Sequence, residues 1–140
     1  IIERIAALEE APAAAPGLAP PTLDALRDQL PPRTTALHYF CAQRRCWAFA
    51  MSREDFEVVP IDAVRLREAR TRLDAMAGQP LTPDLIGSFG DTLLGPVRIA
   101  PGTDRLAVSA DFPVERVPFA ALPLPSGGVV IDAYSVVRMP

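Results

Sequence analysis

The sequence contains no lysine and few other reactive side chains, which excludes several kinds of chemistry. All 14 basic residues are arginines, His38 is the only histidine, and Cys41 and Cys46 are the only cysteines. Schiff-base enzymes, pyridoxal phosphate enzymes and P-loop nucleotide-binding proteins depend on a lysine, so none of these classes fits. One histidine and two cysteines supply at most three zinc ligands. We therefore expect a scaffold or binding piece rather than a complete enzyme, with no metal and no cofactor.

Charge and hydropathy exclude two further kinds of partner. The net charge of -3 provides no basic surface for DNA or RNA. No apolar run approaches the roughly 20 residues that span a bilayer, and no signal peptide opens the chain. Two cysteines do not indicate a disulfide framework, so a reducing compartment is the default. We expect a cytoplasmic protein with no nucleic-acid partner and no membrane partner.

The first 21 residues differ in pattern from the rest. Within residues 1–10, aliphatic side chains recur at helical spacing with charges opposite, which is typical of the end of a preceding helical domain: Ile1, Ile2, Ile5 and Leu8. Residues 11–21 are rich in Pro and Ala and indicate an extended tether. Because the first residue is not Met, we expect a piece of a longer protein. Residues 22–140 follow this linker as a separate part of the chain.

Residues 34–51 are predicted to form a β-hairpin that turns at Gln43-Arg44. With that turn, Cys41 faces Cys46 and Phe40 faces Trp47. The period of two places His38, Phe40, Trp47 and Phe49 on one face, and Leu37, Tyr39, Cys41, Cys46, Ala48 and Ala50 on the other. Both faces are apolar, so we expect both to be covered. A third strand is predicted over residues 55–61.

This register separates the reactive side chains of the hairpin. His38 lies three residues from Cys41, an offset that places the two on opposite faces of a strand, and Cys46 shares the face of Cys41. We therefore expect a core histidine rather than a thiol–imidazole pair. The two cysteines are close enough in register to bond, but disulfide geometry is demanding, and two buried thiols are favoured.

The second half of the chain predicts helices followed by strands. Asp62 can cap a helix that ends at Gly78, with its arginines on a solvated face or, alternatively, facing an anionic partner. Thr82-Pro83 starts a second helix that Gly95-Pro96 stops. Strands are predicted at 105–110 and 129–140, joined by a proline-rich connector. The fold class is α/β, or an α+β fragment, and a short helix capped by Thr22 precedes the hairpin.

Three stretches resemble, in order, the CHAT domain, a caspase-like module often found after tetratricopeptide repeats. They are TALHYFCAQRRCWAFAMSRE (35–54), FGDTLLGPVR (89–98) and LAVSADFPVERVPFAALPLPSGGVVIDAYSVVRMP (106–140). The first resembles the family's opening hairpin, the second its Leu-Leu-x-Pro helix end, and the third its Asp-containing turn and Pro-Phe-x-x-Leu connector. The residues that carry the resemblance are Tyr39, Trp47, Asp111, Pro118, Phe119 and Leu122.

The resemblance implies the N-terminal portion of a CHAT domain over residues 22–140. The family is similar to caspases and separases, and its active members are cysteine peptidases whose catalytic His and Cys come later in the chain, so no catalytic residue is carried over here. The implied role of the parent protein is regulated proteolysis in a bacterium. The implied partners are the C-terminal catalytic part of the module, an upstream helical or tetratricopeptide-repeat region, and a protein or peptide substrate of the parent protein. Two alternatives are a non-catalytic interaction module of a CHAT-like signalling protein and an independent small α+β binding domain.

Overall fold

The computed structural model describes residues 22–139 and contains a five-stranded mixed sheet with helices, which confirms the predicted α/β class. The amphipathic segment 1–10 and the tether 11–21 lie outside the described residues. The strand order is β3-β2-β1-β4-β5. The elements in chain order are α2 (Leu23–Asp28), β1 (Thr34–Ala42), β2 (Arg45–Met51), β3 (Phe56–Ile61), α3 (Ala63–Ala75), α4 (Pro83–Leu93), β4 (Arg105–Ala110), the 3-10 turn η2 (Phe119–Ala121), α5 (Val130–Ala133) and β5 (Ser135–Arg138).

The predicted hairpin register is confirmed. Strands β1 and β2 pair antiparallel with Phe40 opposite Trp47 and Cys41 opposite Cys46. The two-residue turn places Gln43 at a φ of 56°, and the left-handed conformation at this position suits the twist of a tight hairpin. Strand β3 adds to β2 antiparallel, whereas β4 pairs parallel with β1 and β5 pairs parallel with β4. β1, β2 and β3 therefore form an antiparallel part of the sheet, and β4 and β5 extend it in parallel from β1.

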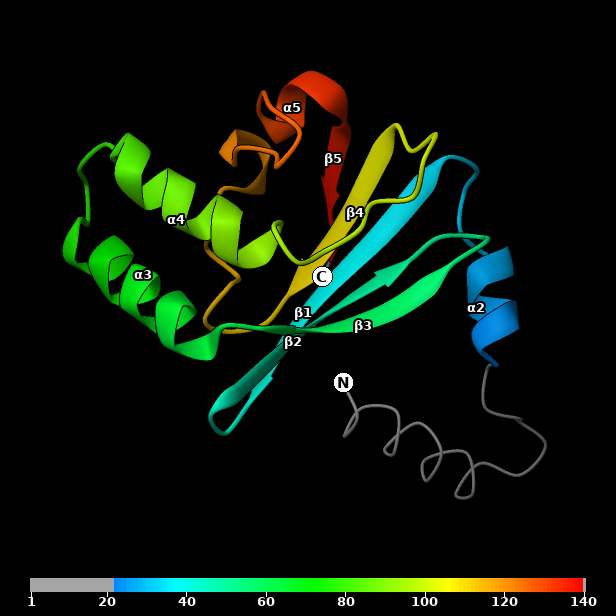
Figure 1. The fold of residues 1–140 in the computed structure, drawn as a ribbon, viewed down its shortest axis with the longest axis horizontal. Coiled ribbons are helices and arrows are strands. Elements are labelled where there is room, and N and C mark those ends of the chain that lie inside the picture. Colours follow the sequence, from blue (N-terminus) through cyan, green and yellow to red (C-terminus); the bar gives the residue numbers. More distant parts are fainter. Residues whose placement is uncertain (1–21, 140) are drawn as a thin grey trace.

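The two long helices begin where the sequence predicts. The Asp62 carboxylate accepts a hydrogen bond from the backbone N–H of Arg65 at 3.0 Å, and the Thr82 hydroxyl accepts one from Leu85 at 3.2 Å. Each cap satisfies a backbone donor that the first helical turn leaves without an intrahelical partner. Figure 1 shows α3 and α4 side by side, on the same side of the sheet as α5. Helix α2 lies apart from them, beside the turn between β2 and β3.

The prediction of one strand over residues 129–140 is wrong. Residues Val130–Ala133 form the short helix α5, and only Ser135–Arg138 form a strand. The Val130 N–H donates to the Leu122 carbonyl at 2.9 Å, and the Tyr134 N–H donates to the Val130 carbonyl at 2.9 Å. Hydrogen bonds to the connector and within one helical turn therefore outweigh the β propensity of the valines.

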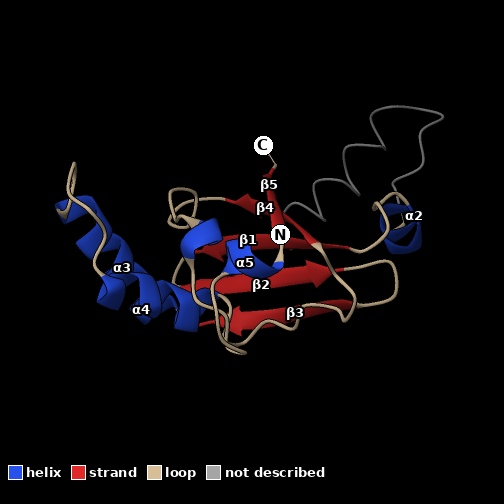
Figure 2. Ribbon diagram, turned by 90° about the horizontal axis from the view of Figure 1, so that it is seen from above, coloured by secondary structure: helices blue, strands red, loops and turns tan. Residues whose placement is uncertain are grey.

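The core lies between the sheet and the helical side. Its buried side chains come from one face of the strands, from α3, α4 and α5, and from the connector that contains η2. Figure 2 shows α5 in front of the sheet, with α3 and α4 at one end of the strands. Gly90 allows the close approach of α4 to this connector, because a Cβ there would lie 2.7 Å from the Pro123 side chain. The glycine therefore permits a backbone contact that outweighs its low helix propensity.

Tyr39 joins the sheet to α4 at the centre of this core. The side chain is 1% exposed, and its hydroxyl donates a hydrogen bond of 2.7 Å to the Leu93 carbonyl at the end of α4. The last carbonyls of a helix have no intrahelical donor. The Tyr39 hydroxyl therefore supplies the Leu93 carbonyl with a hydrogen bond that it would otherwise lack in the buried core. Burial raises the pKa of the Tyr39 phenol well above its usual value of 10.0.

We expect Tyr39→Phe to lower the free energy of unfolding by about 1–2 kcal/mol, because the Leu93 carbonyl loses its donor. Wild-type stability from the protonated phenol is complete below the unfolded pKa and is lost as the pH rises above it, by about 1.4 kcal/mol for each pH unit. Urea denaturation at neutral and strongly alkaline pH measures both effects. Tyr39→Phe should remove most of the alkaline loss, and an unchanged alkaline loss would contradict the assignment.

Candidate interaction surfaces

One face of the sheet carries apolar side chains with no helix over it in the part of the chain that the structure describes. We call this surface the open face. The prediction that both faces of the hairpin are covered is therefore wrong for residues 22–139. The strand pairings place the following side chains on the open face: Ala36, His38, Phe40, Trp47, Phe49, Met51, Phe56, Val58, Pro60, Ala107, Ser109 and Val137.

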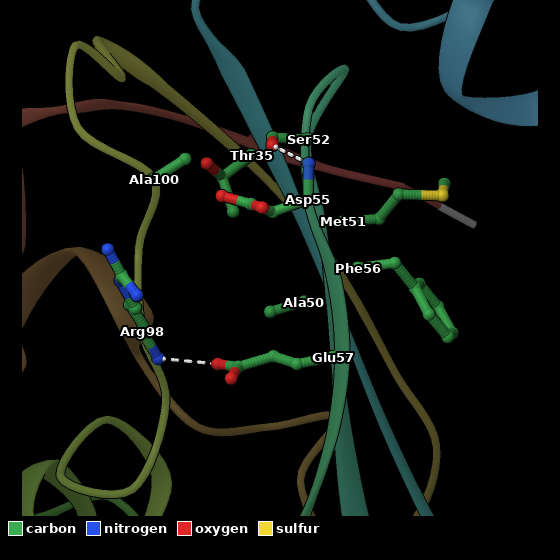
Figure 3. Close-up of a pocket in the computed structure, with 9 residues that line it drawn as sticks. All are labelled: Thr35, Ala50, Met51, Ser52, Asp55, Phe56, Glu57, Arg98 and Ala100. Carbon is green, nitrogen blue, oxygen red and sulfur yellow. Dashed lines mark hydrogen bonds between the residues drawn. The ribbon is translucent and has the colours of Figure 1, made fainter. Parts of the chain in front are cut away.

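Several side chains of the open face are exposed to solvent, whereas those of the opposite face are buried. Phe56 is 37% exposed, Val58 43% and Val137 44%, whereas Leu37 and Ala48 on the opposite face are 0% exposed. In Figure 3, Met51 and Phe56 point to the opposite side of the strands from Ala50 and Glu57. Extended apolar surface of this kind is rare on a soluble monomer unless something binds to it.

Aromatic pairs organise the middle of the open face. The rings of Phe40 and Trp47 stack with centroids 6.3 Å apart and an interplanar angle of 19°. Phe49 and Phe56 meet at 5.8 Å and 58°. Trp47, expected in the core, is half-buried and belongs to this surface instead. Rigid rings that are already paired can bind a partner with little loss of side-chain entropy.

The hairpin does not bring its histidine and cysteines together. His38 lies opposite Phe49 on the open face and is half-buried, so it is not the core residue that the sequence predicts. Cys41 and Cys46 lie on the other face and form a disulfide, with Cα atoms 4.0 Å apart. The prediction of two free thiols is therefore wrong. The separation of His38 from both sulfurs, which the strand period predicts, is confirmed.

The outer edge of β5 is a second candidate surface. The sheet ends at this strand within the described residues, and β5 pairs with β4 over only four residues. Backbone groups of alternate residues point to opposite sides of a strand. Since the N–H groups of Ser135 and Met139 donate toward the β4 side, those of Val136 and Arg138 face outward. Such an edge is a template for a further strand.

The residues that carry the CHAT resemblance fall mostly around one buried contact. Tyr39 and Phe119 are both buried, with ring centroids 5.3 Å apart, and Leu122 belongs to the same core. Pro118 immediately precedes η2. Asp111 follows β4, and its backbone N–H donates to the Tyr39 carbonyl at 3.3 Å. Trp47 lies apart from this group, on the open face.

Two arginines that the sequence analysis did not single out hold the connector in place. Arg138 lies over the Phe119 ring at 5.3 Å and donates to the backbone carbonyls of Glu115 and Val117. Arg70 is 8% exposed, although the arginines of α3 are predicted to be solvated. The burial of Arg70 could have been predicted from the sequence, because Arg70 lies four residues after buried Leu66, on the apolar side of the helix.

Buried Arg70 is the centre of a polar cluster whose two carboxylates are partly exposed. Its guanidinium donates to Glu115 at 2.8 Å, to Asp74 at 2.9 Å and to the Pro113 carbonyl at 2.9 Å. It also lies 4.9 Å from the centroid of the Phe112 ring. Burial alone lowers the pKa of Arg70, but the hydrogen bonds and charges of Glu115 and Asp74 outweigh burial and raise its pKa. The cluster fixes the loop after β4 to α3.

A small hollow at the end of the sheet is lined by residues of β1, β2, β3, the turn between β2 and β3, and the segment after α4. It encloses about 120 Å³, and neither cysteine nor histidine lines it. Small-molecule sites typically enclose roughly 300–1,000 Å³. Figure 3 shows Glu57 reaching across it to accept a hydrogen bond from the backbone N–H of Arg98, at 2.9 Å. This carboxylate already has a structural partner.

Nowhere in residues 22–139 do three or more metal-ligating side chains gather. Among the helices of this range, none has the length and apolar character needed to cross a bilayer. No protein-family model and no curated protein matches the sequence.

Proposed function

We propose that this chain is the structural and regulatory N-terminal part of a caspase-like, CHAT-type cysteine peptidase module. In this proposal the parent protein hydrolyses peptide bonds with a His and a Cys that follow this chain. The chain supplies the first half of the sheet and couples it, through residues 1–21, to an upstream helical or tetratricopeptide-repeat region. The observation that supports the proposal best is the outer edge of β5, which pairs with no strand of residues 22–139.

The form of the sheet favours continuation at β5 rather than at β3. Parallel strands are found almost always inside α/β sheets whose faces are both covered, and here the parallel half ends after two pairings. At the opposite edge, β3 contains Pro60, which lacks the N–H that a further strand would require. β5 contains no proline and a single charged residue, Arg138.

The two cysteines of this chain are not placed to act as a catalytic nucleophile. A catalytic thiolate needs a free sulfur with a base within hydrogen-bond reach. Cys41 and Cys46 are bonded to each other and lie on the face opposite His38. A role in packing the hairpin therefore accounts for these residues, and the proposed chemistry belongs to the following part of the module.

To test this proposal, the chain and the segment that follows Pro140 in its gene are expressed together as two separate polypeptides. We expect them to copurify in equal amounts and to cleave protein substrates only when together. Val136→Pro removes an outward N–H and should weaken association at least several-fold. Val136→Ala loses side-chain packing but keeps that N–H, so it is the matched control and should still associate.

The same complex separates the peptidase proposal from its alternative. Alkylation of a Cys in the following segment should abolish cleavage, whereas Cys41→Ser and Cys46→Ser should leave cleavage largely intact. Equal association of the Val136→Pro and Val136→Ala variants would contradict pairing at β5. A following segment that associates but contains no His and Cys would instead support a non-catalytic protein–protein interaction module.

A further inference from the structure

We propose that the segment 1–10 of this chain binds the open face as an amphipathic helix. Its aliphatic residues would pack on the aromatic centre of that face, around Phe40, Trp47 and Phe49. This inference goes beyond the proposed function, which concerns the edge of β5 and gives residues 1–21 only the role of a connection to an upstream region. It assigns an intramolecular occupant to a surface that the described helices leave uncovered.

The chemistry of the segment matches the surface. Ile1, Ile2, Ile5 and Leu8 recur at helical spacing, whereas Glu3 and Glu10 lie on the other side of the same helix. Helical stability in proteins comes mostly from packing of an amphipathic face, so the aliphatic side of this helix requires an apolar surface. The open face offers flat rings on β1 and β2, flanked by the exposed Val58 of β3.

The described chain begins at α2, which is attached beside the open face. The Arg27 guanidinium on α2 donates to the carbonyls of Arg53 and Glu54, at 3.0 and 2.9 Å. The Arg53 side chain donates back to the Leu30 carbonyl at 2.7 Å. These bonds fix α2 beside the turn that joins β2 to β3. The open-face residues Met51 and Phe56 flank that same turn.

The tether is long enough to reach the whole open face. Residues 11–21, in extended polyproline geometry at about 3.1 Å per residue, span up to roughly 34 Å. Strand β2 has seven residues, which at about 3.3 Å each extend roughly 23 Å. Attachment by a short tether also gives the segment a local concentration in the millimolar range, which favours it over a separate molecule.

Charge favours the same occupant. Segment 1–10 contains three glutamates and one arginine, a net charge of -2. The pairings place Arg45, at the start of β2 beside the hairpin turn, and Arg105, at the start of β4, on the open-face side, and both are exposed. The aromatic centre therefore lies between two cations. Such pairs add little affinity but help to orient an acidic helix.

The test uses Trp47, the only tryptophan of the chain, as a reporter on the open face. In the full 140-residue chain, we expect blue-shifted emission that acrylamide quenches weakly. The variant Ile5→Glu/Leu8→Glu should shift the emission to the red and raise the quenching constant several-fold. The control variant Glu3→Gln/Glu10→Gln changes only the charged side and should leave both values near wild type.

Two further measurements decide between occupants. A synthetic peptide of residues 1–21, added to the Ile5→Glu/Leu8→Glu chain, should restore weak quenching, and light scattering should show a monomer throughout. Equal quenching of the wild-type and Ile5→Glu/Leu8→Glu chains, with unchanged far-ultraviolet circular dichroism, would overturn the proposal. Weak quenching that depends on protein concentration and accompanies a dimer would assign the open face to a second copy, which also overturns it.

Discussion

Replacing Phe119 by alanine should lower the free energy of unfolding by about 3–5 kcal/mol, a large part of the stability of a domain this size. The ring is 2% exposed and lies between the buried phenol of Tyr39, at 5.3 Å, and the guanidinium of Arg138, at 5.3 Å. Alanine would leave a cavity that the connector and the sheet cannot close together. Urea denaturation followed by circular dichroism measures the loss.

Phe112→Ala is the matched control for this substitution. Phe112 belongs to the same connector, but 67% of it is exposed, and its described ring contact is with Arg70. Its loss should cost at most about 1 kcal/mol. Similar losses for Phe112→Ala and Phe119→Ala would mean that the connector does not pack on the sheet, and the position of η2 would then be wrong.

The hairpin and both long helices were predictable because local chemistry decides them. A two-residue turn sets the pairing of Phe40 with Trp47, and the capping residues Asp62 and Thr82 set the helix starts. Each of these signals acts within a few residues. Patterns of period 2 and 3.6 then determine which side chains share a face.

The errors arose where distant contacts decide the outcome. Residues 130–133 have strand-like side chains, but the hydrogen bond from Val130 to Leu122 places them in a helical turn. Arg70 carries a charge that usually stays in water, yet carboxylates and a carbonyl from two segments compensate its burial. The sulfurs of Cys41 and Cys46 were correctly paired in register, but register alone does not decide whether a bond forms.

The open face illustrates the same limit for a surface. Strand period correctly grouped His38, Phe40, Trp47 and Phe49, but an apolar face looks the same in a sequence whether it is covered or open. Its exposure depends on where α3, α4 and α5 pack, and all three pack on the other side (Figure 1).

Arg70→Ala should cost about 2–3 kcal/mol, the second largest loss expected, although Arg70 is only one of several charged residues on α3. The substitution leaves the Pro113 carbonyl without its described donor and separates Glu115 and Asp74 from their shared cation. The loss stays below that of a fully buried ion pair, because the Glu115 and Asp74 side chains are 36% and 47% exposed and water can solvate them.

Arg72→Ala provides the comparison on the same helix. Arg72 is 49% exposed and pairs at 3.1 Å with Asp84, which is 87% exposed, so its removal should cost well under about 1 kcal/mol. Arg70→Lys should recover little stability, because an ammonium group cannot donate to the same three acceptors with the geometry of the planar guanidinium. Amide exchange at Val114 and Val117 should accelerate in Arg70→Ala and not in Arg72→Ala. Equal exchange rates in both variants would mean that the loop after β4 keeps its position without Arg70. Other contacts, such as the hydrogen bond from the Asp111 N–H to the Tyr39 carbonyl, would then be enough to hold the loop.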